Sequence, residues 1–239
     1  APRLVSKVKT PPFAYDVALH GDIAYVVCGA SGVVAIDVTQ RDAPRIRSTF
    51  VGRPGFRVAV FGETLVQIAN QFVAGSWNGL EFIDISNPDS LASLAEYQAP
   101  ATCPCGVPRG ISASPDGQIF VAAEGYRSGG MWILDGSRIP VVSPDAFFTP
   151  REIRDSLDVA VADGTAFVAA GNGWRLVNIS VPTDPKLMTG GQILPYGGLD
   201  LTIDNGLAYV ADADAGLSII DLADPAQPTL VGSSDYGEE

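Results

Sequence analysis

The feature of this 239-residue sequence that most constrains its fold is an internal repeat. Five times the chain shows a glycine, four mostly apolar residues and then Asp or Asn, and successive glycines are 43 to 51 residues apart. The copies are Gly32–Asp37, Gly79–Asp84, Gly130–Asp135, Gly173–Asn178 and Gly216–Asp221. A period of this length is typical of β-propeller blades and of helical arrays.

Each copy is preceded by two apolar runs that a short turn joins, as in residues 16–19 and 23–27. The turns contain residues such as Asn205-Gly206, which accept the positive φ of tight hairpins. A Pro-containing turn and one more apolar run, for example residues 229–232, follow each copy. No 3.6-residue periodicity is present, so helices are disfavoured. The sequence therefore predicts an all-β fold, a five-bladed β-propeller of four-stranded antiparallel blades.

The repeat boundaries divide one predicted domain, residues 1–239, into blades. We letter the strands of each blade A to D, from the propeller axis outward. Residues 1–14 are predicted to add an extra outer strand. The predicted blades are residues 15–56, 57–108, 109–156, 157–198 and 199–239.

The last repeat carries the clearest resemblance to a known family. Tyr209–Asp212, Gly216–Asp221, Asp224-Pro225 and Pro228–Gly232 resemble the LVIVD repeat family, whose propeller-forming repeats occur in exported or surface proteins of bacteria and archaea. Residues 15–56 and 199–232 match best, and residues 57–156 are degenerate. The resemblance implies a propeller in an extracellular, cell-surface or periplasmic location. It does not indicate a function, because the matching residues are those that build blades.

Charge and hydropathy exclude some partners. The chain has 27 acidic and 15 basic residues, a net charge of −12, and no run of Lys or Arg, which disfavours nucleic acid and anionic membrane surfaces. No apolar stretch approaches the roughly 18 residues of a membrane span. The chain begins Ala1-Pro2-Arg3 without a charged, hydrophobic leader, so a signal peptide was either removed or never present.

Residues that recur in every blade are interpreted as structural. The Asp or Asn that ends each strand C is expected to accept hydrogen bonds from turn amides. The glycine that opens each strand C is expected to permit close approach of strands B and C.

The residues that open the A strands differ between blades, and a propeller brings its A strands together around one axis. A mixed site at the channel mouth would hold a small polar ligand, and its carboxylates alone could hold Ca²⁺, although no metal or other cofactor is assigned. The alternative is a lattice of salt bridges between blades. The residues are Asp16, Arg57, Arg109 beside Gly110, Asp158 and Asp200.

Long insertions are expected on one face of the propeller, where the B-to-C and D-to-A loops meet: residues 70–78, 98–108 and 124–129. Trp77 and Tyr126 lie in these loops, and Trp174 opens a strand C. Such rings stack on sugars or anchor a protein partner. Equally, they would cap the blade ends as apolar lids.

Cysteine and histidine are sparse. Cys103 and Cys105 form a CPC sequence that would close a local disulfide, pair one of its thiols with Cys28, or stay reduced. The only histidine, His20, falls in an A-to-B turn on the opposite face, which disfavours a zinc site or a His-dependent nucleophile. The preferred prediction is a non-catalytic recognition or scaffold module that binds a protein partner or glycan through its loops. The alternative is an enzyme that acts on a small polar substrate at the ring of carboxylates and arginines.

Overall fold

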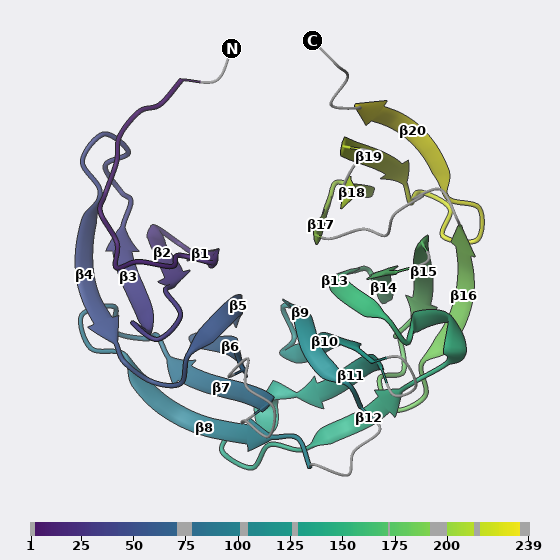
Figure 1. Ribbon diagram of the computed structural model, residues 1–239, viewed down its shortest axis with the longest axis horizontal. Helices are drawn as coiled ribbons and strands as arrows, with labels where there is room; N and C mark the ends of the chain where they lie inside the picture. Colours follow the sequence, from purple (N-terminus) through teal and green to yellow (C-terminus); the bar gives the residue numbers. More distant parts are fainter. Residues whose placement is uncertain are drawn as a thin grey trace. The chain divides into compact units, whose positions relative to one another are not determined.

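The computed structural model describes residues 3–70, 78–100, 105–125, 129–171, 173–191, 200–212 and 216–234. These residues form five four-stranded antiparallel sheets, each with its strands in chain order (Figure 1). The described residues contain no α-helix, only the two 3-10 turns η1 (Gly136–Arg138) and η2 (Arg151–Ile153). The predicted fold class, a five-bladed β-propeller, is confirmed.

The strands follow the predicted A-to-D order in every sheet. The first sheet is β1 (Asp16–His20), β2 (Ile23–Val27), β3 (Val33–Asp37) and β4 (Arg45–Phe50), and the second is β5 (Gly55–Phe61), β6 (Thr64–Asn70), β7 (Asn78–Asp84) and β8 (Ala92–Gln98). The third is β9 (Val107–Ala113), β10 (Gln118–Glu124), β11 (Gly130–Asp135) and β12 (Pro144–Phe148). The fourth is β13 (Ser156–Ala162), β14 (Thr165–Ala170), β15 (Gly173–Asn178) and β16 (Lys186–Gly191). The fifth is β17 (Asp200–Asp204), β18 (Leu207–Asp212), β19 (Gly216–Asp221) and β20 (Thr229–Ser234).

The chain forms two compact units, which we describe separately. The amino-terminal unit comprises residues 1–98 and 138–142 and contains the first two sheets. The carboxy-terminal unit comprises residues 99–137 and 143–239 and contains the other three. Whether the chain is one domain, as the repeats predict, stays a prediction.

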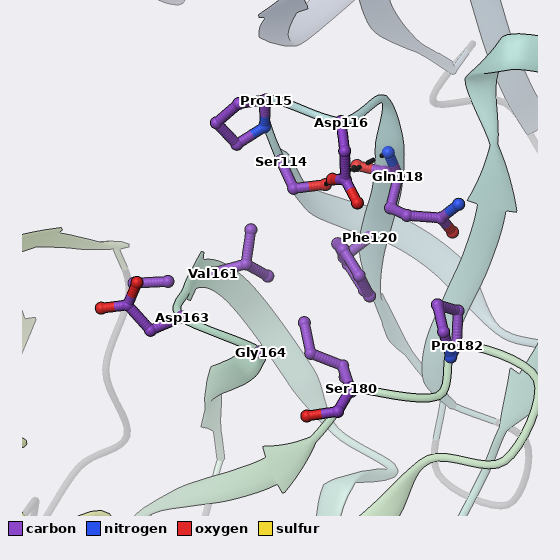
Figure 2. Close-up of a pocket in the computed structure, with 12 residues that line it drawn as sticks. Ser114, Pro115, Asp116, Gln118, Phe120, Val161, Asp163, Gly164, Ser180 and Pro182 are labelled. Carbon is purple, nitrogen blue, oxygen red and sulfur yellow. Dashed lines mark hydrogen bonds between the residues drawn. The ribbon is translucent and has the colours of Figure 1, made fainter.

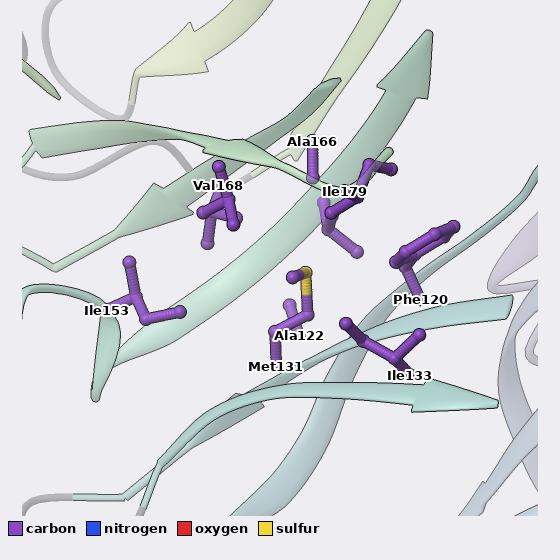
Figure 3. Close-up of a cluster of buried hydrophobic side chains, with 10 residues drawn as sticks. Phe120, Ala122, Met131, Ile133, Ile153, Ala166, Val168 and Ile179 are labelled. Atoms are coloured by element: carbon purple, nitrogen blue, oxygen red, sulfur yellow. The ribbon is translucent and has the colours of Figure 1, made fainter. Parts of the chain in front are cut away.

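Each unit has its apolar core between consecutive sheets. In the amino-terminal unit, Tyr25 and Val27 of the first sheet pack with Leu65 and Ile83 of the second. In the carboxy-terminal unit, a cluster that includes Met131 joins the third and fourth sheets (Figure 3), and another joins the fourth and fifth. In the first four sheets most residues of the B and C strands are buried, which explains why these strands read as continuous apolar runs rather than as alternating sequences.

The recurring Asp and Asn residues perform the predicted turn role in all five sheets. Each side-chain oxygen accepts a hydrogen bond from the backbone N–H two residues later. The donors and distances are Thr39 (3.0 Å), Ser86 (2.9 Å), Ser137 (2.9 Å), Ser180 (3.0 Å) and Ala223 (2.8 Å). The structural interpretation of this series is confirmed.

The recurring glycines face a different neighbour from the one expected. A Cβ at Gly32 would clash with the carbonyl oxygen of Phe50, and one at Gly79 with that of Tyr97. Phe50 and Tyr97 lie on the D strands, so the close approach is between strands C and D rather than B and C. Gly32 also has a φ of +86°, a backbone conformation that side chains other than glycine rarely adopt.

The predicted extra outer strand over residues 1–14 is wrong for its described part, because residues 3–14 form no strand. Val8 instead packs against the buried cluster of the first sheet that includes Cys28 and Val34. Pro11 and Pro12 lack the backbone N–H that a strand ladder needs. The segment therefore covers the apolar face of a sheet instead of extending it.

Candidate functional site

The first predicted site residue, Asp16, connects two sheets of the amino-terminal unit. Its Oδ1 accepts a hydrogen bond from the N–H of Val17 at 2.8 Å, and its Oδ2 accepts one from the N–H of Val58 at 3.0 Å. Val58 lies on β5, the A strand of the next sheet. A charged acceptor strengthens such a bond relative to a neutral one. Asp16 therefore braces the first sheet against the second.

Asp158 makes the corresponding brace in the carboxy-terminal unit. Its side chain is buried, with the residue 5% exposed, and its Oδ2 accepts a hydrogen bond from the N–H of Leu201 on β17 at 2.9 Å. Gly110 on β9 lies against the same carboxylate, because a Cβ there would clash with Asp158 Oδ1. Asp158 thus contacts the A strands of the sheets before and after its own.

The remaining predicted residues at the A strands lie close to these two braces. Arg109 donates from Nε to Oε2 of Glu124 at 2.6 Å, and Glu124 lies in the same sheet. Half-buried Arg57 and exposed Asp200 directly precede Val58 and Leu201, the residues whose amides the braces bind. Within each unit the structure therefore brings predicted positions side by side. That all five meet at one channel mouth stays a prediction.

The described residues offer neither a metal-ligand cluster nor a membrane-spanning helix. No group of three or more His, Cys, Asp or Glu side chains in the described ranges could hold a metal ion. Over the same part of the chain, no helix is long and apolar enough to cross a membrane.

Three aromatic side chains were predicted to bind a ligand, and Trp174 is the one within the described residues; it is buried. Its ring stacks on Phe167 with centroids 5.2 Å apart and is 2% exposed, so its face is closed to a ligand. This placement agrees with the alternative that such rings cap blade ends. Trp77 and Tyr126 lie outside the described residues.

The cysteines are in two different states. Cys105 is disulfide-bonded, whereas Cys28 is a free, buried thiol. A disulfide to Cys28, one of the three alternatives, is therefore wrong, and Cys103 lies outside the described residues. Burial raises the pKa of the Cys28 thiol, which keeps it protonated and unreactive. His20 was predicted in an A-to-B turn; it is the last residue of β1, directly before that turn, with Nε2 3.5 Å from Oε1 of Glu63.

A buried polar cluster in the amino-terminal unit was missed by the sequence reasoning. Gln67 on β6 and Glu81 on β7 are directly paired and 0% and 2% exposed. Gln67 Nε2 donates to Glu81 Oε2 at 2.7 Å and to the carbonyl of Arg53 at 3.1 Å, and the N–H of Arg53 donates to Glu81 Oε2 at 2.8 Å. The guanidinium of Arg53 pairs with Glu96 at 2.8 Å. The sequence signal was a polar residue in the middle of each of two paired apolar runs.

This cluster is closed and fixes the connector between β4 and β5. Burial raises the pKa of Glu81 despite the two hydrogen bonds that its carboxylate accepts. A Cβ at Gly52 would clash with the Glu81 carboxylate, and one at Gly55 with Gln67 Oε1. No room is left beside these atoms, so the arrangement holds the chain rather than a substrate.

The sheets, their braces and their turns define a β-propeller repeat protein. The sequence profile of the LVIVD repeat matches residues 13–48, 71–98, 153–190 and 199–235, which is more than half of the chain. The chain therefore belongs to the LVIVD repeat family. Of residues 57–156, which the sequence reasoning described as degenerate, the profile matches residues 71–98 in the second sheet, whereas the third sheet lies outside these matches.

Comparison with solved structures gives the same fold. A putative 6-phosphogluconolactonase from Bacteroides uniformis is similar with a TM-score of 0.76 at 13% identity, over 98% of this chain and 75% of that one. A functionally unknown protein from Desulfotomaculum acetoxidans gives 0.71 at 15% identity, over 97% and 73%. The computationally designed Ika8 protein is similar with a TM-score of 0.63 at 11% identity, over 94% of this chain. This chain spans 62% of the length of that protein. A search of curated proteins finds no match. Identities this low show the fold alone.

Proposed function

We propose that this chain is a non-catalytic recognition or scaffold module, exported or surface-associated, that binds a protein partner or glycan through the loops at residues 70–78, 98–108 and 124–129. One observation carries the proposal. Asp16 and Asp158, two of the carboxylates that a catalytic site would need, bind backbone amides of the neighbouring sheet. Their geometry serves the stacking of blades.

The same reasoning weakens the enzyme alternative. A substrate at Asp158 would compete with the N–H of Leu201 for a side chain that is 5% exposed. Leaving that buried amide without an acceptor costs about 1 to 3 kcal/mol. Catalysis at this carboxylate would therefore act against the stability of the fold.

Charge and loop composition support recognition of a neutral or basic surface. The net charge of −12 disfavours anionic partners at long range. Trp77 and Tyr126 fall in two of the proposed loops, and aromatic rings are the side chains most often found in sugar stacking and at protein hot spots.

The proposal is tested with loop variants on a glycan array and in crosslinking to proteins of the native source. One variant replaces residues 71–77 with Gly and Ser, and the other replaces residues 99–102, which leaves Cys103 in place. Both are expected to lose the binding that the parent chain shows. Asp204→Asn, an exposed change at the opposite strand ends, is the matched control and is expected to keep it. Binding that survives both loop replacements, in variants whose thermal unfolding is unchanged, contradicts the proposal.

A further inference from the structure

One face of the first sheet is exposed at positions that other sheets bury. On each A strand we compare the residue that pairs, through strand B, with the second residue after the recurring glycine. This residue is 7% exposed at Val58, 2% at Val159 and 9% at Leu201, because each packs against the sheet that precedes its own. Its counterpart in the first sheet, Val17, is 56% exposed, and Leu19 on the same face is 67% exposed. We call this face, with Val17 and Leu19 on its A strand, the docking face.

The backbone N–H of Val17 also differs from its counterparts. The N–H groups of Val58 and Leu201 donate to the aspartate of the preceding sheet, which is Asp16 and Asp158 respectively. The N–H of Val17 donates instead to Asp16 of its own strand, at 2.8 Å. A sheet that packed on the docking face with an aspartate in the same register would offer this amide the acceptor that its counterparts have.

Residues 3–8 lie along the docking face, at its C strand, where the outer strand of a preceding sheet would lie. The Ser6 hydroxyl donates to the carbonyl of Arg41 at 2.6 Å, and the hydroxyl of Ser48 on β4 donates to the carbonyl of Pro88 at the same distance. Arg41 and Pro88 each follow the recurring aspartate of their sheet by four residues. Residues 3–8 nevertheless form no strand, and four of the six are exposed. The segment therefore holds the position of an outer strand through few contacts.

The fifth sheet carries the surface that a preceding sheet needs. In the fourth sheet, Trp174 directly follows the recurring glycine and packs against the fifth sheet, where it is 2% exposed. Leu217 has the same position in the fifth sheet and is 39% exposed. Asp200 has the register of Asp158, because each is paired through strand B with the residue after the glycine. The fifth sheet thus combines an exposed apolar side chain with an aspartate in the brace position.

We propose that the docking face binds the fifth sheet of a second copy of this chain, and that residues 3–8 cover the face in the free chain until β20 of that copy displaces them. Residues 2–6 read Pro-Arg-Leu-Val-Ser and residues 228–232 read Pro-Thr-Leu-Val-Gly, so the two segments are similar enough to exchange. In the complex, Leu217 packs on the docking face and Asp200 accepts a hydrogen bond from the N–H of Val17. Each copy has one docking face and one fifth sheet, so the contact is head-to-tail and forms dimers or larger assemblies.

Association is tested by sedimentation equilibrium of the whole chain at about 0.15 M salt, since salt screens the repulsion between copies of net charge −12. The wild type is expected to associate with a Kd of about 100 μM or below. Deletion of residues 1–9 is expected to strengthen association about tenfold, because the covering segment no longer competes. A single-chain mass at every concentration in both proteins, or weaker association after the deletion, overturns the proposal.

A charged substitution locates the contact. Val17→Asp is expected to weaken association about tenfold or more, because it places a carboxylate in an apolar contact. Val181→Asp is the matched control, since Val181 is also 56% exposed but lies in a turn of the fourth sheet, and it is expected to keep wild-type association. Thermal unfolding shows whether both variants stay folded. Equal effects of the two substitutions on association overturn the proposal.

Disulfide trapping identifies the occupant. Chains with Val17→Cys are mixed with chains with Asp200→Cys under mild oxidation, and a disulfide between two chains is expected, because Asp158 approaches Leu201 in the corresponding contact. Val181→Cys in place of Val17→Cys is the control and is expected to give none. A chain with both Val17→Cys and Asp200→Cys is then oxidised well below the Kd. An intrachain disulfide in that chain shows that its own fifth sheet is the occupant and overturns the proposal, as does the absence of a disulfide between the mixed chains.

Discussion

The contact between the first and second sheets differs from the contact between the third and fourth. The first contains a closed polar cluster, Gln67 with Glu81, and a tyrosine hydroxyl that reaches the next sheet. The second is apolar, with Met131 and Ile153 in its core, and opens at one end into a cavity of about 430 Å³ beside Phe120 (Figure 2). Both use the same strand order and the same turn hydrogen bonds. The repeat therefore fixes how sheets are built, while a few side chains between them decide whether a contact is sealed or open.

The largest expected effect tests the apolar contact. Ile133→Ala should lower the free energy of unfolding by about 3 to 4 kcal/mol, because Ile133 is fully buried and the deletion leaves a cavity. Chemical denaturation of the whole chain measures it. A loss below about 1 kcal/mol would show that this contact collapses freely.

The next effect tests the polar contact. Glu81→Ala should cost about 2 to 3 kcal/mol, because Gln67 Nε2 and the N–H of Arg53 lose a buried acceptor. Glu81→Gln retains an oxygen acceptor and is the control. If the two variants were equally stable, the hydrogen bonds would contribute nothing measurable.

The two braces should differ in strength. Asp158→Ala is expected to destabilise by about 2 kcal/mol and Asp16→Ala by about 1 kcal/mol, since the more buried amide is costlier to leave unsatisfied. Thermal and denaturant unfolding of both variants gives the comparison. The reverse order would mean that burial does not govern the strength of the brace.

A reciprocal pair of substitutions exchanges the two contacts at one register position. Tyr25 and Phe120 each pair with the third residue after the glycine that opens strand C. Tyr25→Phe should cost about 1 kcal/mol through the lost hydrogen bond to the Ile85 carbonyl. Phe120→Tyr should leave stability unchanged or raise it, since its hydroxyl enters an existing space. A destabilisation by Phe120→Tyr larger than that by Tyr25→Phe would show that the two positions are not equivalent.

The smallest effect depends on pH. Glu81 has a pKa above its ordinary value of 4.5, so the folded chain binds this proton more tightly than the unfolded chain does. The contribution of Glu81 to stability is therefore greatest below about pH 4.5 and is lost as the pH rises through the raised pKa. The free energy of unfolding of the wild type should therefore rise relative to that of Glu81→Gln as the pH falls across this window. Denaturant unfolding of both proteins at several pH values measures the difference. A difference between the two proteins that stays constant with pH contradicts the raised pKa.

The sequence predicted the fold well because its signals are local and repeated. The Asp37 series and the strand runs recur in every copy, so each copy supports the interpretation of the others. The extra outer strand was wrong because Arg3 to Val8 shows an apolar pattern that serves equally for covering a sheet, and pattern alone does not distinguish the two.

The candidate site was less predictable because it depends on contacts between repeats. Register placed Asp16 and Asp158 at the A strands, yet only coordinates show that their partners are amides of the next sheet. The Gln67–Glu81 pair and the space beside Phe120 depend on which residues face each other across two strands or two sheets. Sequence spacing along one strand does not contain that information.

The brace made by Asp16 has a consequence for how such a chain can diversify. Its partner across 42 residues is a backbone N–H, and every residue except proline offers one. A copied repeat that keeps its aspartate can therefore attach to a following copy whose own side chains have changed, as with Arg57 and Val58. Because the attachment of one repeat to the next does not depend on the side chains of the next repeat, individual repeats can acquire new surfaces while the array stays assembled.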